Sequence, residues 1–154
     1  MLVGTAAVAV LGVTSAACGK QPPPPDLDDL VGQRDQALSD SQLAADAAKA
    51  AKPDVAPALT AVAAQRSDHA RALSDEIARL TGETTASATP TTTTTGPAAA
   101  PTARDVVAAL KASADSAGRL AVQMSGYRAG LLGSIAASCT AAHTVALAGQ
   151  DGGS

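Results

Sequence analysis

The sequence predicts an all-α fold, a four-helix bundle built from two antiparallel hairpins. Alanine supplies 39 of the 154 residues, and alanine has the highest helix propensity of all residues. Aromatic residues make up 1% of the chain, so the residues that favour strands are scarce. Apolar residues recur at helical spacing in four segments, which are separated by a short, a long and a second short connection. Residues 27–149 are therefore expected to form one helical domain.

The first hairpin is expected over residues 27–81. Asp26 stands where it can cap the first helix, and Asp54 where it can cap the second. Pro53 should end the first helix, and Gly82 the second. The apolar stripe expected on the first helix is Leu27, Leu30, Val31, Leu38 and Ala45. The stripe expected on the second is Val55, Leu59, Val62, Ala63, Ala70, Leu73, Ile77 and Leu80.

The second hairpin is expected over residues 102–149. Thr102 and Asp105 have the spacing of a capping box, which should open its first helix. The inner face of that helix is expected to be Val106, Leu110, Ala117, Leu120 and Met124. The last helix should run from Tyr127 to Leu147. Its inner face is expected to be Leu132, Ile135, Cys139, Ala142, His143 and Ala146.

A biased segment of Thr, Ala and Pro, residues 82–101, separates the two hairpins. It has no periodicity and is predicted to be a linker, either a solvated connection or a site of O-glycosylation. One long crossover between two hairpins is the way in which ferritin-like bundles connect four helices. Residues 150–154 are expected to form a loose tail.

The amino terminus has the order of residues found in export signals. Residues 1–17 carry no charge and end in small residues directly before Cys18. The stretch Ser15-Ala16-Ala17-Cys18 resembles a bacterial lipobox, which implies that Cys18 is lipidated and becomes the first residue of the mature chain. The alternatives are an uncleaved membrane anchor and ordinary secretion, after which Cys18 could pair with Cys139.

Residues 18–26, with four consecutive prolines, predict an extended tether between the lipid and the bundle. A Cys carrying two acyl chains is held stably in a membrane. We therefore expect the protein at the extracytoplasmic face of the cell membrane.

The segments LLGSIAASCTAAHTVAL (131–147) and AVAAQRSDHARAL (61–73) carry a family resemblance. Together they resemble an uncharacterised ferritin-like domain family of actinobacterial proteins, a domain of unknown function often found in alanine-rich chains. The resemblance covers roughly residues 27–148 and implies a ferritin-like four-helix fold. It implies no established activity.

The metal ligands of a ferritin-like site are missing from this sequence. Such a site takes a Glu-x-x-His pair from each of two helices and a further carboxylate from each of the others. The residues three before His69 and His143 are Arg66 and Thr140, and neither is a carboxylate. We therefore expect no cofactor.

His69, Cys139 and His143 are the alternative metal candidates. Cys139 and His143 are four residues apart and share a helix face, and His69 could supply a third ligand for Zn or Cu. The other interpretation is that Cys139 is a small buried apolar residue and that both histidines lie at or near the core.

Arg34 and Arg66 both fall within apolar stripes, which is unusual for a charged residue. They could meet across the first hairpin and bind an anion or the carboxylate of a partner protein. Alternatively, their stems lie on apolar surface while the guanidinium groups reach water at the edge of the bundle.

These observations favour a non-enzymatic cell-envelope lipoprotein that acts as a binding or structural module, with an envelope protein or a small ligand as its partner. The chain has a formal net charge of −3 and no cluster of Lys and Arg, so the sequence does not predict the basic surface that binds nucleic acid. A metal-binding or redox protein using Cys139, His143 and His69 is the second hypothesis. A carrier of apolar ligands is the third, because small side chains can leave space between helices.

Overall fold

The computed structural model describes residues 24, 26–82 and 99–150, and within them every regular element is helical. Helix α1 spans Leu27–Ala50, α2 spans Ala56–Thr81, α3 spans Ala103–Ala121 and α4 spans Gly126–Ala141. A π-helical turn, η1 (Ala142–Ala146), continues α4. The predicted export segment, the lipidation site Cys18 and most of the predicted linker lie outside the described residues.

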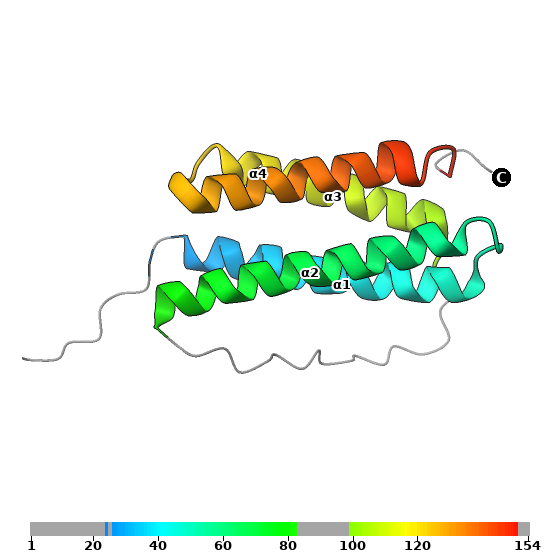
Figure 1. Ribbon diagram of the computed structural model, residues 1–154, viewed down its shortest axis with the longest axis horizontal. Coiled ribbons are helices and arrows are strands. Elements are labelled where there is room, and N and C mark those ends of the chain that lie inside the picture. Colours follow the sequence, from blue (N-terminus) through cyan, green and yellow to red (C-terminus); the bar gives the residue numbers. More distant parts are fainter. Residues whose placement is uncertain (1–23, 25, 83–98, 151–154) are drawn as a thin grey trace, which may run out of the picture.

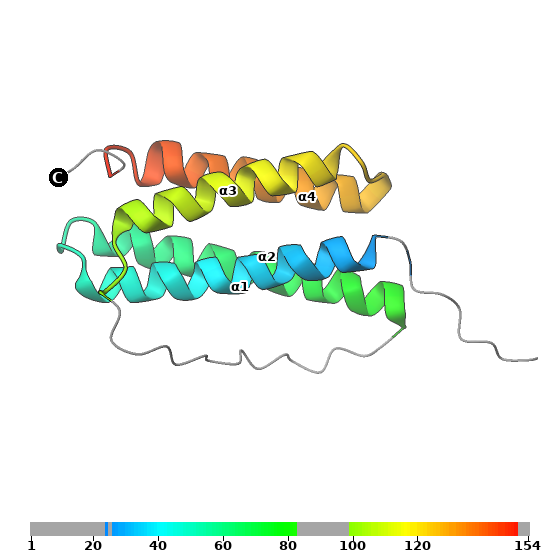
Figure 2. The same ribbon diagram turned by 180° about the vertical axis from the view of Figure 1, so that it is seen from behind.

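The four helices form two layers, as Figures 1 and 2 show. Helices α1 and α2 pack antiparallel in one layer, α3 and α4 pack antiparallel in the other, and α1 also packs against α3. Helix α2 runs in the same direction as α3, so the end of α2 and the start of α3 lie at opposite ends of the bundle. The prediction of an all-α bundle of two hairpins is confirmed for this part of the chain.

The helix ends follow the sequence in some places and depart from it in others. Thr102 forms the predicted capping box with Asp105, and Gly82 ends α2 in the left-handed conformation with φ 70°. Asp54 does not cap α2, because that helix begins one residue later, with Val55 at the N-cap position and no side-chain cap. Asp26 is the N-cap residue of α1, but its carboxylate pairs with Arg128 of α4 at 2.8 Å rather than with its own helix.

Helix α1 buries a different face from the one predicted. Its buried residues are Leu30, Gln33, Ala37, Asp40, Ala44 and Ala47. They recur in alternating steps of three and four, the spacing of the inner positions of a coiled coil. Of the predicted stripe only Leu30 is among them, while Val31 and Leu38 are only partly buried. The prediction followed the larger apolar residues, whereas this helix contacts its neighbours through small and polar residues.

The inner face of α4 is as predicted up to the last turn. Leu132, Ile135 and Cys139 are each at most 1% exposed. In η1, however, the backbone N–H of Leu147 bonds to the carbonyl of Ala142 at 2.9 Å, five residues back. This wider turn changes the phase of the helix, so Leu147 is buried where Ala146 was expected.

The segment Gly126–Ala146 is long and apolar enough to cross a membrane by length and composition alone. Core helices of soluble bundles pass the same test. Here Leu132 and Ile135 are buried in the apolar core, whereas Tyr127 and Val145 of the same segment are exposed.

Replacing Ile135 with Asp should unfold the bundle. The side chain is 1% exposed, and losing its apolar contacts while burying an unpaired carboxylate should cost about 4 kcal/mol or more. The matched control is Ala137→Asp, because Ala137 is exposed on the same helix. Far-UV circular dichroism and urea titration should show loss of the fold in the first variant only. Equal stability of both variants would mean that the inner face of α4 is assigned wrongly.

Candidate functional site

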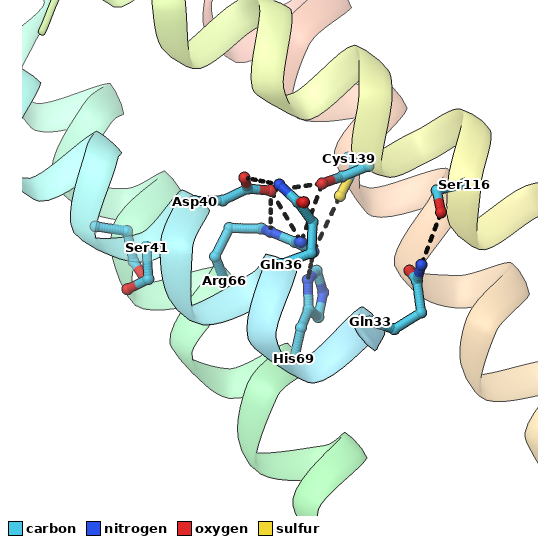
Figure 3. A network of polar contacts seen from close by, with 10 residues as sticks. Gln33, Gln36, Asp40, Ser41, Arg66, His69, Ser116 and Cys139 are labelled. Atoms are coloured by element: carbon cyan, nitrogen blue, oxygen red, sulfur yellow. Dashed lines mark hydrogen bonds and ion pairs between the residues drawn. The ribbon is translucent and has the colours of Figure 1, made fainter. Parts of the chain in front are cut away.

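A buried ion pair lies at the centre of the bundle, between Arg66 of α2 and Asp40 of α1 (Figure 3). The two side chains are 1% and 2% exposed, and Nη2 of Arg66 lies 2.9 Å from Oδ2 of Asp40. Nε of Arg66 donates to the same oxygen at 3.1 Å. Two charges removed from water this completely are stable only when each is paired and hydrogen-bonded.

Helices α3 and α4 supply further hydrogen bonds to this ion pair. The hydroxyl of Ser113, on α3, donates to Oδ2 of Asp40 at 2.6 Å and accepts from Nη2 of Arg66 at 3.3 Å. The sulfur of Cys139, on α4, accepts from Nη1 of Arg66 at 3.3 Å. Gln36 donates to the second oxygen of Asp40 at 2.7 Å. Each of the four helices therefore contributes a polar group to one centre, called here the Arg66 centre.

His69 also contacts the Arg66 centre. Its Nδ1 lies 3.0 Å from Nη1 of Arg66, and a guanidinium can only donate. Nδ1 must therefore accept, which places the ring proton on Nε2. Burial, followed by the positive charge of Arg66, lowers the pKa of His69 to about 4. The ring is neutral at neutral pH.

Cys139 is poorly suited to act as a nucleophile. Its side chain is fully buried, and burial raises the pKa of its thiol, with Arg66 opposing this and Asp40 adding to it. A nucleophilic cysteine needs an accessible thiolate. The chemistry available to Cys139 here is that of a weak acceptor for Arg66.

Two of the three residues considered as metal ligands, His69 and Cys139, lie close together in the structure. His69 and Cys139 both contact Nη1 of Arg66, so a cation of the protein itself already lies between them. His143 is partly buried in η1 and is not part of this network. Within the described ranges, no group of three or more His, Cys, Asp or Glu residues is placed to hold a metal ion.

The structure gives Arg34 and Arg66 separate partners. Arg34 pairs with the neighbouring Asp35 at 2.8 Å near the surface. Arg66 lies in the interior, so the expectation that its guanidinium reaches water is wrong. Asp40, a carboxylate of the protein itself, takes the place that one of the two interpretations gave to an anion or to a partner's carboxylate.

Asp40 is the main residue that sequence reasoning missed. The clue was available in part, because Asp40 keeps the spacing of three and four that starts at Leu30. A charged residue within each of two facing stripes, one acidic and one basic, indicates a buried pair. A second polar contact between α1 and α3, from Gln33 to the hydroxyl of Ser116 at 2.8 Å, follows the same spacing.

Comparisons with protein-family models, with curated proteins and with solved structures found no match to this chain. The charge of Asp40 is balanced by that of Arg66, the His69 ring is neutral at neutral pH and Cys139 is buried. Asp40, Arg66, Ser113 and Cys139 hold one another in place through these contacts.

Removing Arg66 alone should be much more damaging than removing both members of the pair. Arg66→Ala leaves the Asp40 carboxylate buried without a counter-ion, which should lower the free energy of unfolding by about 3–5 kcal/mol. The double variant Arg66→Met, Asp40→Leu should recover most of this loss, because no buried charge remains. Urea unfolding of Arg66→Met, of Asp40→Leu and of the double variant measures the coupling between the two residues. Additive losses would show that the two residues do not act as a pair.

Acid should destabilise the protein partly through His69. The pKa of His69 is lower in the folded chain than its ordinary value of 6.5, so between pH 6.5 and about 4 the unfolded chain binds more protons. Stability therefore falls as pH falls through this window. Because the ring is partly exposed, we expect its share to be about 1 kcal/mol. Urea unfolding at pH 7 and pH 4.5 should show a smaller acid loss in His69→Gln than in the wild type or in His143→Gln.

Proposed function

We propose that this protein is a non-enzymatic lipoprotein of the cell envelope, in which a degenerate ferritin-like bundle acts as a binding or structural module. The observation that carries the proposal is the Arg66 centre. In a ferritin-like bundle, acidic residues between the helices would hold a metal ion. Here a guanidinium group paired with Asp40 lies between the helices.

The direction of the helices supports the ferritin-like part of the proposal. Helices α2 and α3 run in the same direction, as do α1 and α4, and every closely packed pair of helices is antiparallel. This arrangement needs one long connection between the hairpins, as in ferritin-like folds. The resemblance of residues 61–73 and 131–147 to a ferritin-like family is consistent with this topology.

The residues at the centre do not fit the metal site of such a fold. In a Glu-x-x-His pair, the carboxylate and the imidazole share one helix face and bind the same ion. Here Arg66 occupies the glutamate position relative to His69, and its guanidinium contacts the imidazole. A fixed positive charge at hydrogen-bond distance from His69 and Cys139 opposes the approach of a second cation.

The envelope location rests on residues 1–26. The uncharged segment 1–17 ends at Cys18, and the proline-rich stretch after it leads into α1 at Leu27. With Cys18 lipidated, the bundle would be held close to the membrane by a tether of residues 18–26. The end of the bundle where α1 begins would then be the end nearest the membrane.

Two measurements test the proposal. Cys18→Ala should move the protein from the membrane fraction to the soluble fraction of its host, because lipidation needs the thiol. Unchanged membrane association would point to an uncleaved anchor.

The second measurement is elemental analysis of wild-type protein purified without chelators, which should find no stoichiometric metal. Stoichiometric Zn, Cu or Fe that is lost in His143→Ala would overturn the non-metal assignment and favour the metal-binding alternative.

A further inference from the structure

A second charged cluster lies near the end of the bundle where α1 begins, between the last turns of α2 and the first turn of α4. Four residues line a hollow of about 360 Å³ there, namely Asp75, Glu76, Arg79 and Tyr127. Two carboxylates and one guanidinium give this hollow a formal net charge of −1.

The carboxylate in this hollow is buried, but its counter-ion is not. The side chain of Glu76 is 1% exposed, while that of Arg79 is 63% exposed. Nη2 and Nε of Arg79 donate to the two oxygens of Glu76 at 2.6 and 2.8 Å, and these bonds raise the pKa of Arg79. The fixed part of the cluster is therefore the acid, and the part that reaches solvent is the cation.

Tyr127 supplies the second recognition element. Its ring lies 5.7 Å from the guanidinium carbon of Arg79, within the range of a cation–π contact. Tyr127 is also one of the large exposed apolar residues of the described chain, at 63%. A buried carboxylate beside an accessible aromatic face suits an organic cation, which is weakly hydrated and can contact both.

Arg79 has another carboxylate within reach on its own helix. Asp75 lies four residues before it and is exposed, and an acid four residues before a base is the favourable order for a helical ion pair. Arg79 can therefore leave Glu76 and still form an ion pair. This alternative lowers the cost of opening the hollow to another cation.

We propose that the hollow is a binding site for an organic monovalent cation with a quaternary ammonium or guanidinium head group. Glu76 binds the charge and Tyr127 covers it, while Arg79 is a built-in competitor that moves toward Asp75 when the ligand enters. The proposal does not depend on the ferritin-like assignment or on lipidation, because it uses only the contacts of these four side chains.

The site carries its own probe, because Tyr127 is the only tyrosine of the chain, which has no Trp and no Phe. Its ring protons can be followed by NMR while methylguanidinium chloride or tetramethylammonium chloride is added, with NaCl at equal ionic strength as the control. The wild type should show a saturable shift with either organic cation and none with NaCl. Arg79→Ala should bind about tenfold more tightly, because the competitor is gone. In Glu76→Gln the shift of the Tyr127 ring protons should not saturate, because the charge that binds the cation is gone.

The matched control is Arg71→Ala, which removes an exposed ion pair with Asp68 three residues away on the same helix. It should bind like the wild type. Circular dichroism verifies that each variant folds, and Arg79→Gln replaces Arg79→Ala if the latter does not. Equal or weaker binding by the folded Arg79 variant, equal binding by Glu76→Gln, or the same shift with NaCl would each overturn the proposal.

Discussion

The ion pair between Arg66 and Asp40 is the interaction on which the arrangement of the four helices depends. Removing two charges from water costs several kcal/mol for each ion, and only good geometry with further hydrogen bonds offsets this cost. Those bonds come from Ser113 on α3 and Cys139 on α4. Sliding any one helix by a turn would leave a charge or a polar atom unsatisfied in the interior. No buried side-chain N or O atom of the described residues lacks a hydrogen-bond partner.

The Arg66 centre is important for the register of the helices, because the small side chains of the apolar core interlock only weakly. Three of the six buried residues of α1 are alanines, and an alanine fits almost equally well against several neighbouring positions. The hydrophobic effect favours collapse without selecting a register. The Arg66 centre supplies that selection, much as a single polar residue at an inner position sets the register of a coiled coil.

The sequence predicted those features that are encoded locally or by large side chains. The capping box at Thr102, the stop at Gly82 and the buried face of α4 through Cys139 depend on neighbouring residues and were predicted correctly. The inner face of α1 was not, since periodicity weighs Leu and Val above Ala, Gln and Asp. The role of Asp40 depends on Arg66, 26 residues away on another helix. Pattern alone identified Arg66 as unusual but could not identify its partner.

The two arginine–carboxylate pairs differ in one property, and this property separates their roles. At the Arg66 centre both partners are about 1–2% exposed, so breaking the pair requires opening the bundle. In the hollow near Tyr127 the carboxylate is buried but Arg79 is 63% exposed, so its guanidinium can move into water without disturbing the helices. The buried carboxylate of Glu76 still needs a counter-ion when Arg79 leaves. The first pair is therefore fixed and structural, whereas the second can exchange its cation for one supplied by a ligand.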